Sequence, residues 1–227
     1  MKFKGTIIGE ASGSVASLTF SHNRGGQYIR QRAVPVNPGT VEQQANRNAI
    51  AELTSRWQSF LTQAQRDSWD TYARNVQLPD SLGEPRDVGG IAMYSRSNVP
   101  RLQVGLPRVD DAPIIFDLGE FTTPSIDSIT PPTGLDIAFT NTDDWANEDD
   151  SAMIILASRP QSAAVNFFKG PYRLSGFIAG DATTAPTSPA TLTLPFVVAT
   201  GQKLFIQGRV SRVDGRLSSA FRLGTVV

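Results

Sequence analysis

The sequence predicts a mainly β protein with an N-terminal β-hairpin arm, a small helical hub and a C-terminal β-sandwich of the immunoglobulin or fibronectin type III kind. The chain has 227 residues with 19 Gly and 15 Pro but only 8% aromatics, which favours short strands joined by many turns. Apolar residues recur every three or four positions between residues 40 and 102, and every second position from about residue 112. We therefore place the arm at residues 1–36, the helical hub at 37–111 and the β-sandwich at 112–227.

The arm is predicted from the alternation of residues 14–20 and 27–33 around a turn. The segment HNRGG, residues 22–26, supplies the Asn and Gly residues that accept positive φ in a tight reversal. Period-two alternation places Leu18 and Phe20 on one face of the hairpin. An isolated two-stranded hairpin is marginal in water, so we expect this one to gain a third strand or to pack on another surface.

Two capping boxes predict two helices. Thr40 and Gln43 bracket T-V-E-Q, and Thr62 and Gln65 bracket T-Q-A-Q, so each threonine can cap the helix that follows it. Residues 33–38 contain two prolines and are expected to form an extended strap. The apolar positions expected to be buried are Ala45, Ala49, Ile50, Leu53, Trp57, Phe60 and Leu61 on the first helix and Trp69, Tyr72, Ala73 and Val76 on the second.

A third helix is predicted after a polar loop at residues 77–88. It begins at the double glycine 89–90, and its repeating positions are Ile91, Tyr94, Asn98 and Leu102. Pro100 lies inside this pattern and lacks the backbone N–H that an uninterrupted helix needs. We therefore expect a break or kink there.

Seven strands are predicted beyond residue 112, separated by clusters of Pro, Gly, Asp and Thr. They are residues 125–129, 135–140, 152–158, 172–178, 192–198, 203–212 and 216–224. The last two form the clearest pair, because Asp214 and Gly215 lie at the centre of a tight hairpin. Seven short strands with frequent turns are typical of a β-sandwich.

Charge is unevenly distributed along a chain whose formal net charge is +0. Residues 1–35 hold five basic groups and one acidic group, a net +4, and residues 113–227 hold eight basic and eleven acidic groups, a net −3. A basic arm could thus be attracted to the acidic body of another copy, although a chance excess on a solvated hairpin explains the pattern equally well. The overall balance gives no reason to expect a nucleic-acid partner. On the arm, however, Arg24, Arg30 and Arg32 are interleaved with Tyr28, a combination that suits binding to a nucleic acid. A nucleic-acid partner therefore stays as the weaker alternative.

Three stretches of the first half carry distinctive turn and helix motifs: SGSVASLTFSHNRGGQYIRQRAVPVNPGT, SRWQSFLTQAQRDSWDTYARN and GGIAMYSRSNVPRLQVGLP. In this order they resemble a family of proteins encoded by tailed phages and prophages, with its Gly-Ser-Val start, NRGG turn, VNP strap and Gly-led helix. The resemblance covers about residues 10–110. It implies a virion structural protein, made in the host cytoplasm, and implies no activity.

The arm and the resemblance together predict a non-enzymatic structural component of a capsid, neck or tail. A hairpin edge can extend the sheet of a neighbour, so the expected partners are other copies of the chain and other virion proteins. The expected subunit-interface residues are Leu18, Phe20, Tyr28 and Ile29, with Arg24, Arg30 and Arg32 setting the orientation. The alternative is a receptor- or glycan-binding module of a tail or fibre, in which sandwich loops at residues 143–150 and 213–216 recognise a host surface glycan or protein.

Few residues can support catalysis. The chain has no Cys and a single histidine, His22, which excludes thiol catalysis, zinc sites built on cysteine and multi-histidine metal centres. His22 lies beside the predicted turn and no G-x-S-x-G motif accompanies it, so we interpret it as a turn or surface residue. We expect no enzyme activity and no cofactor.

The acidic stretch NTDDWANEDD, residues 141–150, is a candidate cation site. Its carboxylates could gather oxygens around Ca²⁺, and they are Asp143, Asp144, Glu148, Asp149 and Asp150. The spacing matches no EF-hand and lacks the central glycine, so a solvated loop is the stronger interpretation and we predict no metal. Trp145, in the same stretch, either covers the end of the sandwich or is an exposed recognition residue, and we favour the first.

No membrane segment is expected. The large apolar residues near Met1 are Phe3, Ile7 and Ile8, which Lys2 and Lys4 interrupt. This is too little for the core of a signal peptide, and no apolar run approaches the length of a membrane span.

Overall fold

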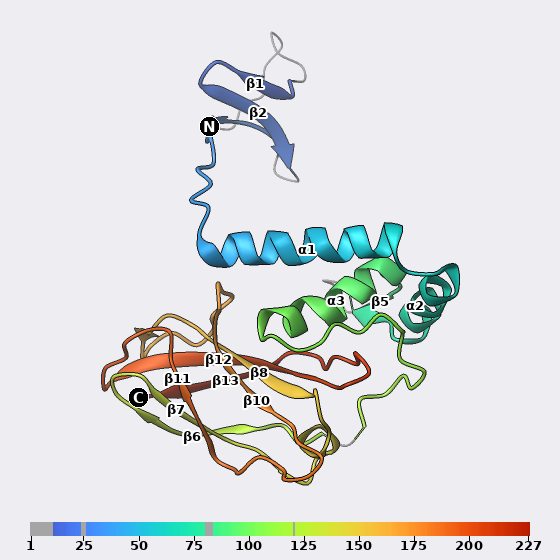
Figure 1. Ribbon diagram of the computed structural model, residues 1–227. Coiled ribbons are helices and arrows are strands. Elements are labelled where there is room, and N and C mark those ends of the chain that lie inside the picture. Colours follow the sequence, from blue (N-terminus) through green and yellow to red (C-terminus); the bar gives the residue numbers. More distant parts are fainter. Residues whose placement is uncertain (1–10, 24–25, 80–83, 120) are drawn as a thin grey trace. The chain divides into compact units, whose positions relative to one another are not determined.

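The computed structural model describes residues 11–23, 26–79, 84–119 and 121–227, and the chain divides into two compact units, Met1–Val41 and Glu42–Val227. The protein is mainly β, as predicted, with 31% of the described residues in strands against 24% in helices. All strand pairs among the described residues are antiparallel. The second unit contains both the helices and the two larger sheets (Figure 1).

The first unit carries a three-stranded sheet, which we call the arm sheet. It consists of β1 (Gly13–Val15), β2 (Leu18–Asn23) and β3 (Gly26–Gln31), in the order β1-β2-β3. The predicted hairpin is formed by β2 and β3, but its first limb, predicted at residues 14–20, is divided between β1 and β2, and β2 extends into the predicted turn. The third strand that the hairpin was expected to need comes from the chain itself, through a turn in which Ala16 adopts a φ of 50°.

Three helices follow among the described residues: α1 (Val41–Ser59), α2 (Gln63–Asn75) and α3 (Gly90–Gln103). The capping box of α2 is confirmed, since the Thr62 N–H donates to Gln65 Oε1 at 2.9 Å and the Gln65 N–H donates to Thr62 Oγ1 at 3.3 Å. α1 begins directly after Thr40. Within the stretch predicted to be a loop, β4 (Leu78–Pro79) pairs with β5 (Pro85–Arg86).

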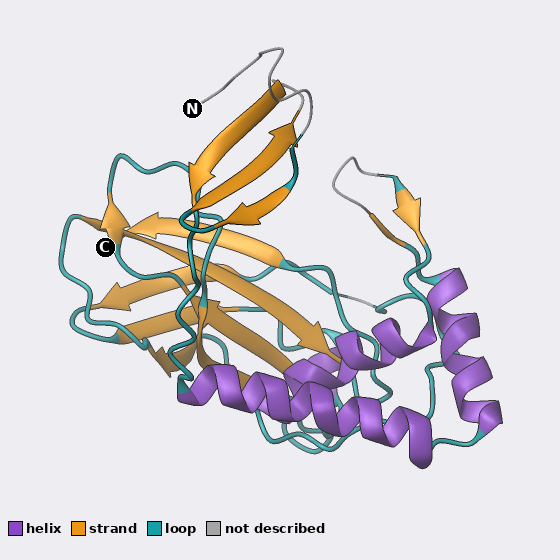
Figure 2. Ribbon diagram, turned by 90° about the horizontal axis from the view of Figure 1, so that it is seen from above, coloured by secondary structure: helices purple, strands orange, loops and turns teal. Residues whose placement is uncertain are grey.

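The helices enclose a core of their own, and they lie together on one side of the larger sheets (Figure 2). Its buried residues are Leu53, Leu61, Trp69, Tyr72, Ala73, Met93 and Tyr94. Because Ala45, Ile50 and Phe60 are exposed, the prediction of an apolar face along the whole of α1 is wrong. The first half of α1 is instead attached to the rest of the second unit by polar side chains. Glu42 pairs with Arg173 of the sandwich, and Asn46 accepts a hydrogen bond from Gln103 of α3.

α3 runs through Pro100 without a break, so the expectation of a break there is wrong, whereas a kink stays a prediction. Its buried side chains include three polar ones: Asn98, which lies at a predicted repeating position, and Ser97 and Arg101, which the pattern does not report. Asn98 is well compensated: its side-chain amide donates to the carbonyls of Tyr94 (3.1 Å) and Val109 (2.9 Å), and its oxygen accepts from the Val109 N–H (2.7 Å). Buried polar groups are tolerated when they are bonded in this way.

Two sheets enclose the second core. One has the order β10-β8-β12-β13, with β9 also pairing with β12, and the other has the order β11-β7-β6. The strands are β6 (Ser125–Thr130), β7 (Gly134–Ala138), β8 (Ala152–Ala157), β9 (Gln161–Ser162), β10 (Arg173–Ala179), β11 (Ala190–Thr193), β12 (Gln202–Ser211) and β13 (Phe221–Val226). Leu135 of β7, Ile155 of β8 and Leu204 of β12 are fully buried in one cluster, so side chains of both sheets share this core. All seven predicted strands are present, although their bounds shift by up to five residues.

The last strand begins later than predicted because the chain before it contacts α3. The turn lies at Asp214 and Gly215, as predicted, and Gly215 uses a φ of 92°. Beyond the turn, the Arg96 guanidinium of α3 donates to the carbonyl oxygens of Leu217 (3.2 Å) and Ser218 (3.1 Å). Regular pairing of β13 with β12 therefore starts only after this contact, at Phe221.

Leu53→Ala should lower the free energy of unfolding by about 2–5 kcal/mol, because Leu53 is fully buried and its truncation leaves a cavity among the helices. Ile50→Ala lies one turn earlier on α1, where the side chain is 50% exposed, and should cost less than about 1 kcal/mol. Urea unfolding of the parent and both variants measures the difference. Similar losses in the two variants would contradict this description of the α1 packing.

Candidate functional site

The arm sheet has two chemically different faces. Residues directly opposite each other in a ladder share a face, and the register pairs Val15 with Leu18 and Phe20 with Ile29. One face therefore carries these four apolar side chains together with the polar residues His22, Gln27 and Gln31, and we call it the apolar face after the former. The other face carries Ser14, Thr19, Ser21, Tyr28 and Arg30. The arm sheet thus offers one apolar face and one polar, basic face.

The structure separates the residues predicted for the subunit interface. Leu18, Phe20 and Ile29 share the apolar face, whereas Tyr28 and Arg30 lie on the other. Arg32 is exposed just beyond β3, where its N–H donates to the Ser17 carbonyl at 2.7 Å. Arg24 lies outside the described residues. A partner that covers the apolar face would therefore meet Tyr28 and Arg30 only at the edges or from the opposite side.

Residues 32–40, which we call the strap, have no regular secondary structure and follow the arm sheet directly. Pro35 and Pro38 hold the backbone extended. The side chains of Val34 and Val36 are 74% and 87% exposed. Closely spaced apolar side chains in a stiff, extended segment favour a contact surface over a plain linker, which is usually polar.

The strap leads into α1, and a single residue, Asp110, ties α1 to the other helices. Arg56 of α1 donates to Asp110 Oδ2 at 2.8 Å, and the Tyr94 hydroxyl of α3 donates to Oδ1 at 2.9 Å. The Trp69 indole of α2 donates to the Asp110 carbonyl at 2.9 Å, and Arg108 also pairs with the carboxylate at 2.9 Å. All three helices thus bond to one residue.

These contacts shift the pKa values of both acids in the cluster. Burial alone would raise the pKa of Asp110, but hydrogen bonds from Arg56, Arg108 and Tyr94 outweigh it, and the pKa lies below its usual value. Burial, followed by the hydrogen bond to the Asp110 carboxylate, raises the pKa of Tyr94 well above its usual value. The ionised carboxylate and the protonated phenol are therefore the stable pair at neutral pH.

Two arginines of α3 attach the helices to the sandwich. Arg101 is almost completely buried, and it donates to Ser211 Oγ (3.1 Å) and to the carbonyls of Arg212 (2.7 Å) and Pro107 (2.7 Å). Arg96 binds the same β12–β13 connection through the two carbonyls described above. Arg101 makes no ion pair with a described residue, so carbonyl oxygens compensate its burial. Helices and sandwich consequently form one compact unit.

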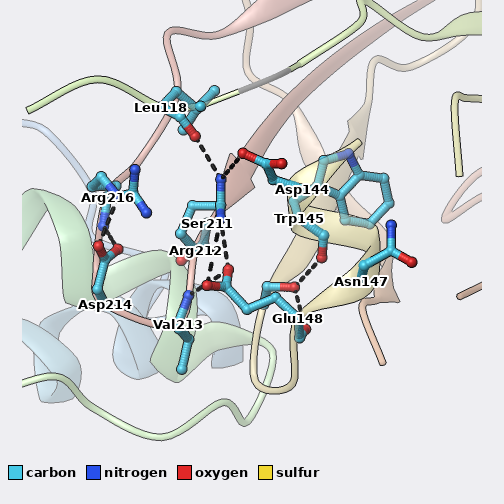
Figure 3. Close-up of polar contacts among 12 residues, drawn as sticks. Leu118, Asp144, Trp145, Asn147, Glu148, Ser211, Arg212, Val213, Asp214 and Arg216 are labelled. Atoms are coloured by element: carbon cyan, nitrogen blue, oxygen red, sulfur yellow. Dashed lines mark hydrogen bonds and ion pairs between the residues drawn. The ribbon is translucent and has the colours of Figure 1, made fainter. Parts of the chain in front are cut away.

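The acidic stretch is engaged by Arg212, which is itself buried (Figure 3). Its guanidinium donates to Glu148 Oε2 (2.6 Å), to Asp144 Oδ2 (3.2 Å) and to the Leu118 carbonyl (2.7 Å). Asp144 begins a short 3₁₀ helix (Asp144–Asn147) that orients these groups. The segment is thus a loop that Arg212 anchors on one side, and several of its residues stay exposed to solvent, among them Asp149 and Asp150.

The other acidic residues considered as metal ligands do not converge on one point. Buried Asp143 accepts hydrogen bonds from the backbone N–H (2.7 Å) and hydroxyl (3.1 Å) of Thr122, and Asp149 accepts one from the Ala182 N–H (2.9 Å). Asp150 is exposed, with a φ of 56°. Within the described ranges, no group of three or more His, Cys, Asp or Glu side chains is placed to hold a metal ion.

Trp145 is buried and packs against Phe139, with ring centroids 5.3 Å apart. The favoured interpretation, that it covers the end of the sandwich, is confirmed, and the alternative of an exposed recognition residue is wrong. The 213–216 turn is also engaged, because Arg216 is buried and donates to Asp214 (2.7 Å) and to the Asp117 carbonyl (2.8 Å). Much of the two loops proposed for receptor recognition therefore makes internal contacts.

Two further sequence predictions concern His22 and membrane-spanning segments. His22 is exposed on β2, opposite Gln27. In the part of the chain that the structure describes, none of the helices combines the length and apolar character of a membrane span.

The residues that organise the second unit were not identified from the sequence. Asp110, Arg101 and Arg212 carry no motif, and their partners lie far away along the chain, up to 111 positions in the case of Arg101. Two of them also bond to backbone carbonyls, which every residue possesses. No sequence pattern could have identified these contacts.

Asp110→Asn should lower the free energy of unfolding at pH 7 by about 1–3 kcal/mol, because it weakens the charge-assisted bonds to two arginines. The folded-state pKa of Asp110 is depressed, so its contribution is complete above about pH 5 and is lost as the pH falls through that pKa. The gap between parent and variant should therefore narrow between pH 7 and pH 3, as followed by urea unfolding. Asp111→Asn, which removes an exposed carboxylate bonded to Gln65, is the control. A gap that stays constant with pH would refute this role of Asp110.

Comparison with known proteins adds no relative: no protein family, no curated protein and no solved structure matches this chain.

Proposed function

We propose that this chain is a non-enzymatic structural component of a tailed-phage virion, in which the arm sheet and strap join neighbouring subunits. Residues 1–41 form a compact unit separate from the rest, and this observation carries the proposal. A separate small sheet on an extended strap can reach a neighbour while the main body keeps its own two cores. The order of motifs in residues 10–110 supports the virion context, in the capsid, neck or tail.

The exposed apolar residues of the strap support a contact with another protein. Val34, Val36 and Val41 lie within eight residues of one another and are all largely exposed. Val15 and Leu18, on the apolar face of the arm sheet, are also exposed. Burial of these side chains by a partner would supply the driving force for assembly, since apolar area removed from water stabilises association.

The sandwich would form the outer body of such a subunit, and we infer that it is of the fibronectin type III kind. Counting the seven long strands in order, the first, second and fifth (β6, β7, β11) form one sheet and the other four form the second. In a constant-type immunoglobulin domain the fourth strand lies beside the fifth. Here the fourth strand, β10, pairs with the third strand, β8, which favours the fibronectin arrangement.

Removal of the arm should abolish assembly and leave a folded monomer. We expect the full chain to form oligomers and a chain starting at Gly39 to be monomeric, as measured by light scattering at matched concentrations. The truncated chain retains both hydrophobic cores, so its circular dichroism and cooperative unfolding should persist. Monomers in both samples would contradict self-assembly through the arm.

Substitutions in the full chain separate a specific contact from the loss of a segment. Val34→Asp combined with Val36→Asp should dissociate the oligomer, whereas Val197→Asp, at a 72% exposed valine of the sandwich, should not. Charge reversal at Arg30 and Arg32 should weaken the same assembly without unfolding the chain. An oligomer that survives all of the arm variants would rule out the arm as the connector.

The virion assignment predicts that purified particles of the encoding phage contain this chain in a fixed number of copies. Quantitative mass spectrometry of gradient-purified particles measures that number. Particles from a phage whose copy lacks residues 1–38 should lose the protein. A chain that is abundant in the infected cell but absent from wild-type particles would refute the assignment.

A further inference from the structure

A hollow of about 290 Å³ lies on the sandwich where β12 and β13 meet the loop that precedes β10. Its size is at the lower end for small-ligand sites, which start at about 300 Å³. It is lined by Asn166, Phe167, Phe168, Tyr172, Lys203, Phe205, Arg222, Leu223 and Gly224. None of these residues belongs to the arm, the helices or the acidic stretch.

The floor of the hollow is the outer face of the β12–β13 ladder. The register pairs Phe205 of β12 with Gly224 of β13. Lys203 lies two positions before Phe205, and Arg222 lies two positions before Gly224. Side chains alternate along a strand, so these residues point away from the core, into which Leu204 projects. Gly224 keeps the floor open, because a Cβ there would lie 3.0 Å from Phe205 Cδ1.

Aromatic rings build one wall. Phe168 stacks on Phe205 with centroids 6.0 Å apart and ring planes 15° from parallel, and Tyr172 meets Phe168 edge-on at 5.2 Å. The Tyr172 hydroxyl donates to the Phe168 carbonyl at 3.0 Å, which fixes the loop. The neighbouring Phe167 remains 66% exposed, so its ring is available as a platform at the mouth of the hollow.

Two cations flank the rings. The Arg222 guanidinium lies 6.0 Å from the Phe167 centroid, and the Lys203 ammonium lies 5.5 Å from that of Phe205. Neither cation makes an ion pair with a described residue, and the lining includes no acidic side chain. Since residues 113–227 carry a net −3, this is a basic site within an acidic region.

We propose that this hollow binds a saccharide unit that carries a carboxylate. The apolar C–H face of a pyranose ring can stack on the exposed Phe167 ring, while the carboxylate pairs with Arg222 and Lys203 by charge-assisted hydrogen bonds. A nucleic acid combines stacking and anionic groups too, but it needs a basic track along its backbone, and the surrounding acidic domain disfavours a long polyanion. The site is independent of the arm, so this proposal holds whether or not the arm joins subunits.

The test is calorimetric or NMR titration of the full chain with two acidic probes, trigalacturonate and sialyllactose. Their neutral counterparts, the methyl ester of trigalacturonate and lactose, keep the rings but remove the charge. Binding of at least one acidic probe is expected, with its neutral counterpart about tenfold weaker or silent. Phe167→Ala and Arg222→Gln should each weaken binding about tenfold.

Matched control variants exist elsewhere in the chain. Phe60 is 65% exposed with the Arg56 guanidinium 5.0 Å from its ring centroid, and Arg159 lies 5.6 Å from the Phe196 ring, so Phe60→Ala and Arg159→Gln remove equivalent groups. Both controls should leave binding unchanged. Failure of both acidic probes to bind, equal binding of the neutral counterparts, or equal loss in the controls would overturn the proposal. Tighter binding of a short oligothymidylate at the same residues would instead assign the hollow to single-stranded nucleic acid.

Discussion

The packing of the three helices in the second unit centres on one residue, Asp110. Asp110 bonds to α1 through Arg56, to α2 through Trp69 and to α3 through Tyr94, so the three helices share a single polar centre beside their small apolar core. Asp110 holds the second half of α1, while the first half, which buries no large side chain, is held by the contacts of Glu42 with Arg173 and of Asn46 with Gln103.

Arginine side chains connect the helices to the sandwich. Arg96 and Arg101 of α3 bind carbonyl groups of the β12–β13 connection, and Arg212 within that connection binds the acidic stretch. A guanidinium suits this task because its planar fork reaches several acceptors at once and stays charged when it is buried. The cost is that the loops at this end of the sandwich are used for internal contacts.

The two surfaces proposed for binding lie on the strap and on the outer face of the sandwich. Val34 and Val36 expose apolar area on the strap, which suits a protein partner. Phe167 and Arg222 combine an exposed ring with a cation that pairs with no acid among the described residues, which suits a small acidic ligand. The first surface belongs to the unit that contains the arm and the second to the sandwich. A subunit with this division could be held in an assembly through one part and meet a ligand with another.

The sequence by itself determined the elements: the arm hairpin, the Thr62 capping box, seven strands in order and the turn at Asp214 are all encoded by local periodicity and turn chemistry. Tertiary structure alone decided which residues meet. Nothing in the local pattern of Asp144 and Glu148 shows that both accept hydrogen bonds from Arg212, which lies more than 60 positions away. The aromatic hollow likewise requires the register that sets Phe205 against Gly224. Local patterns report burial and turns, whereas ion pairs, carbonyl contacts and hollows join residues that only the folded chain brings together.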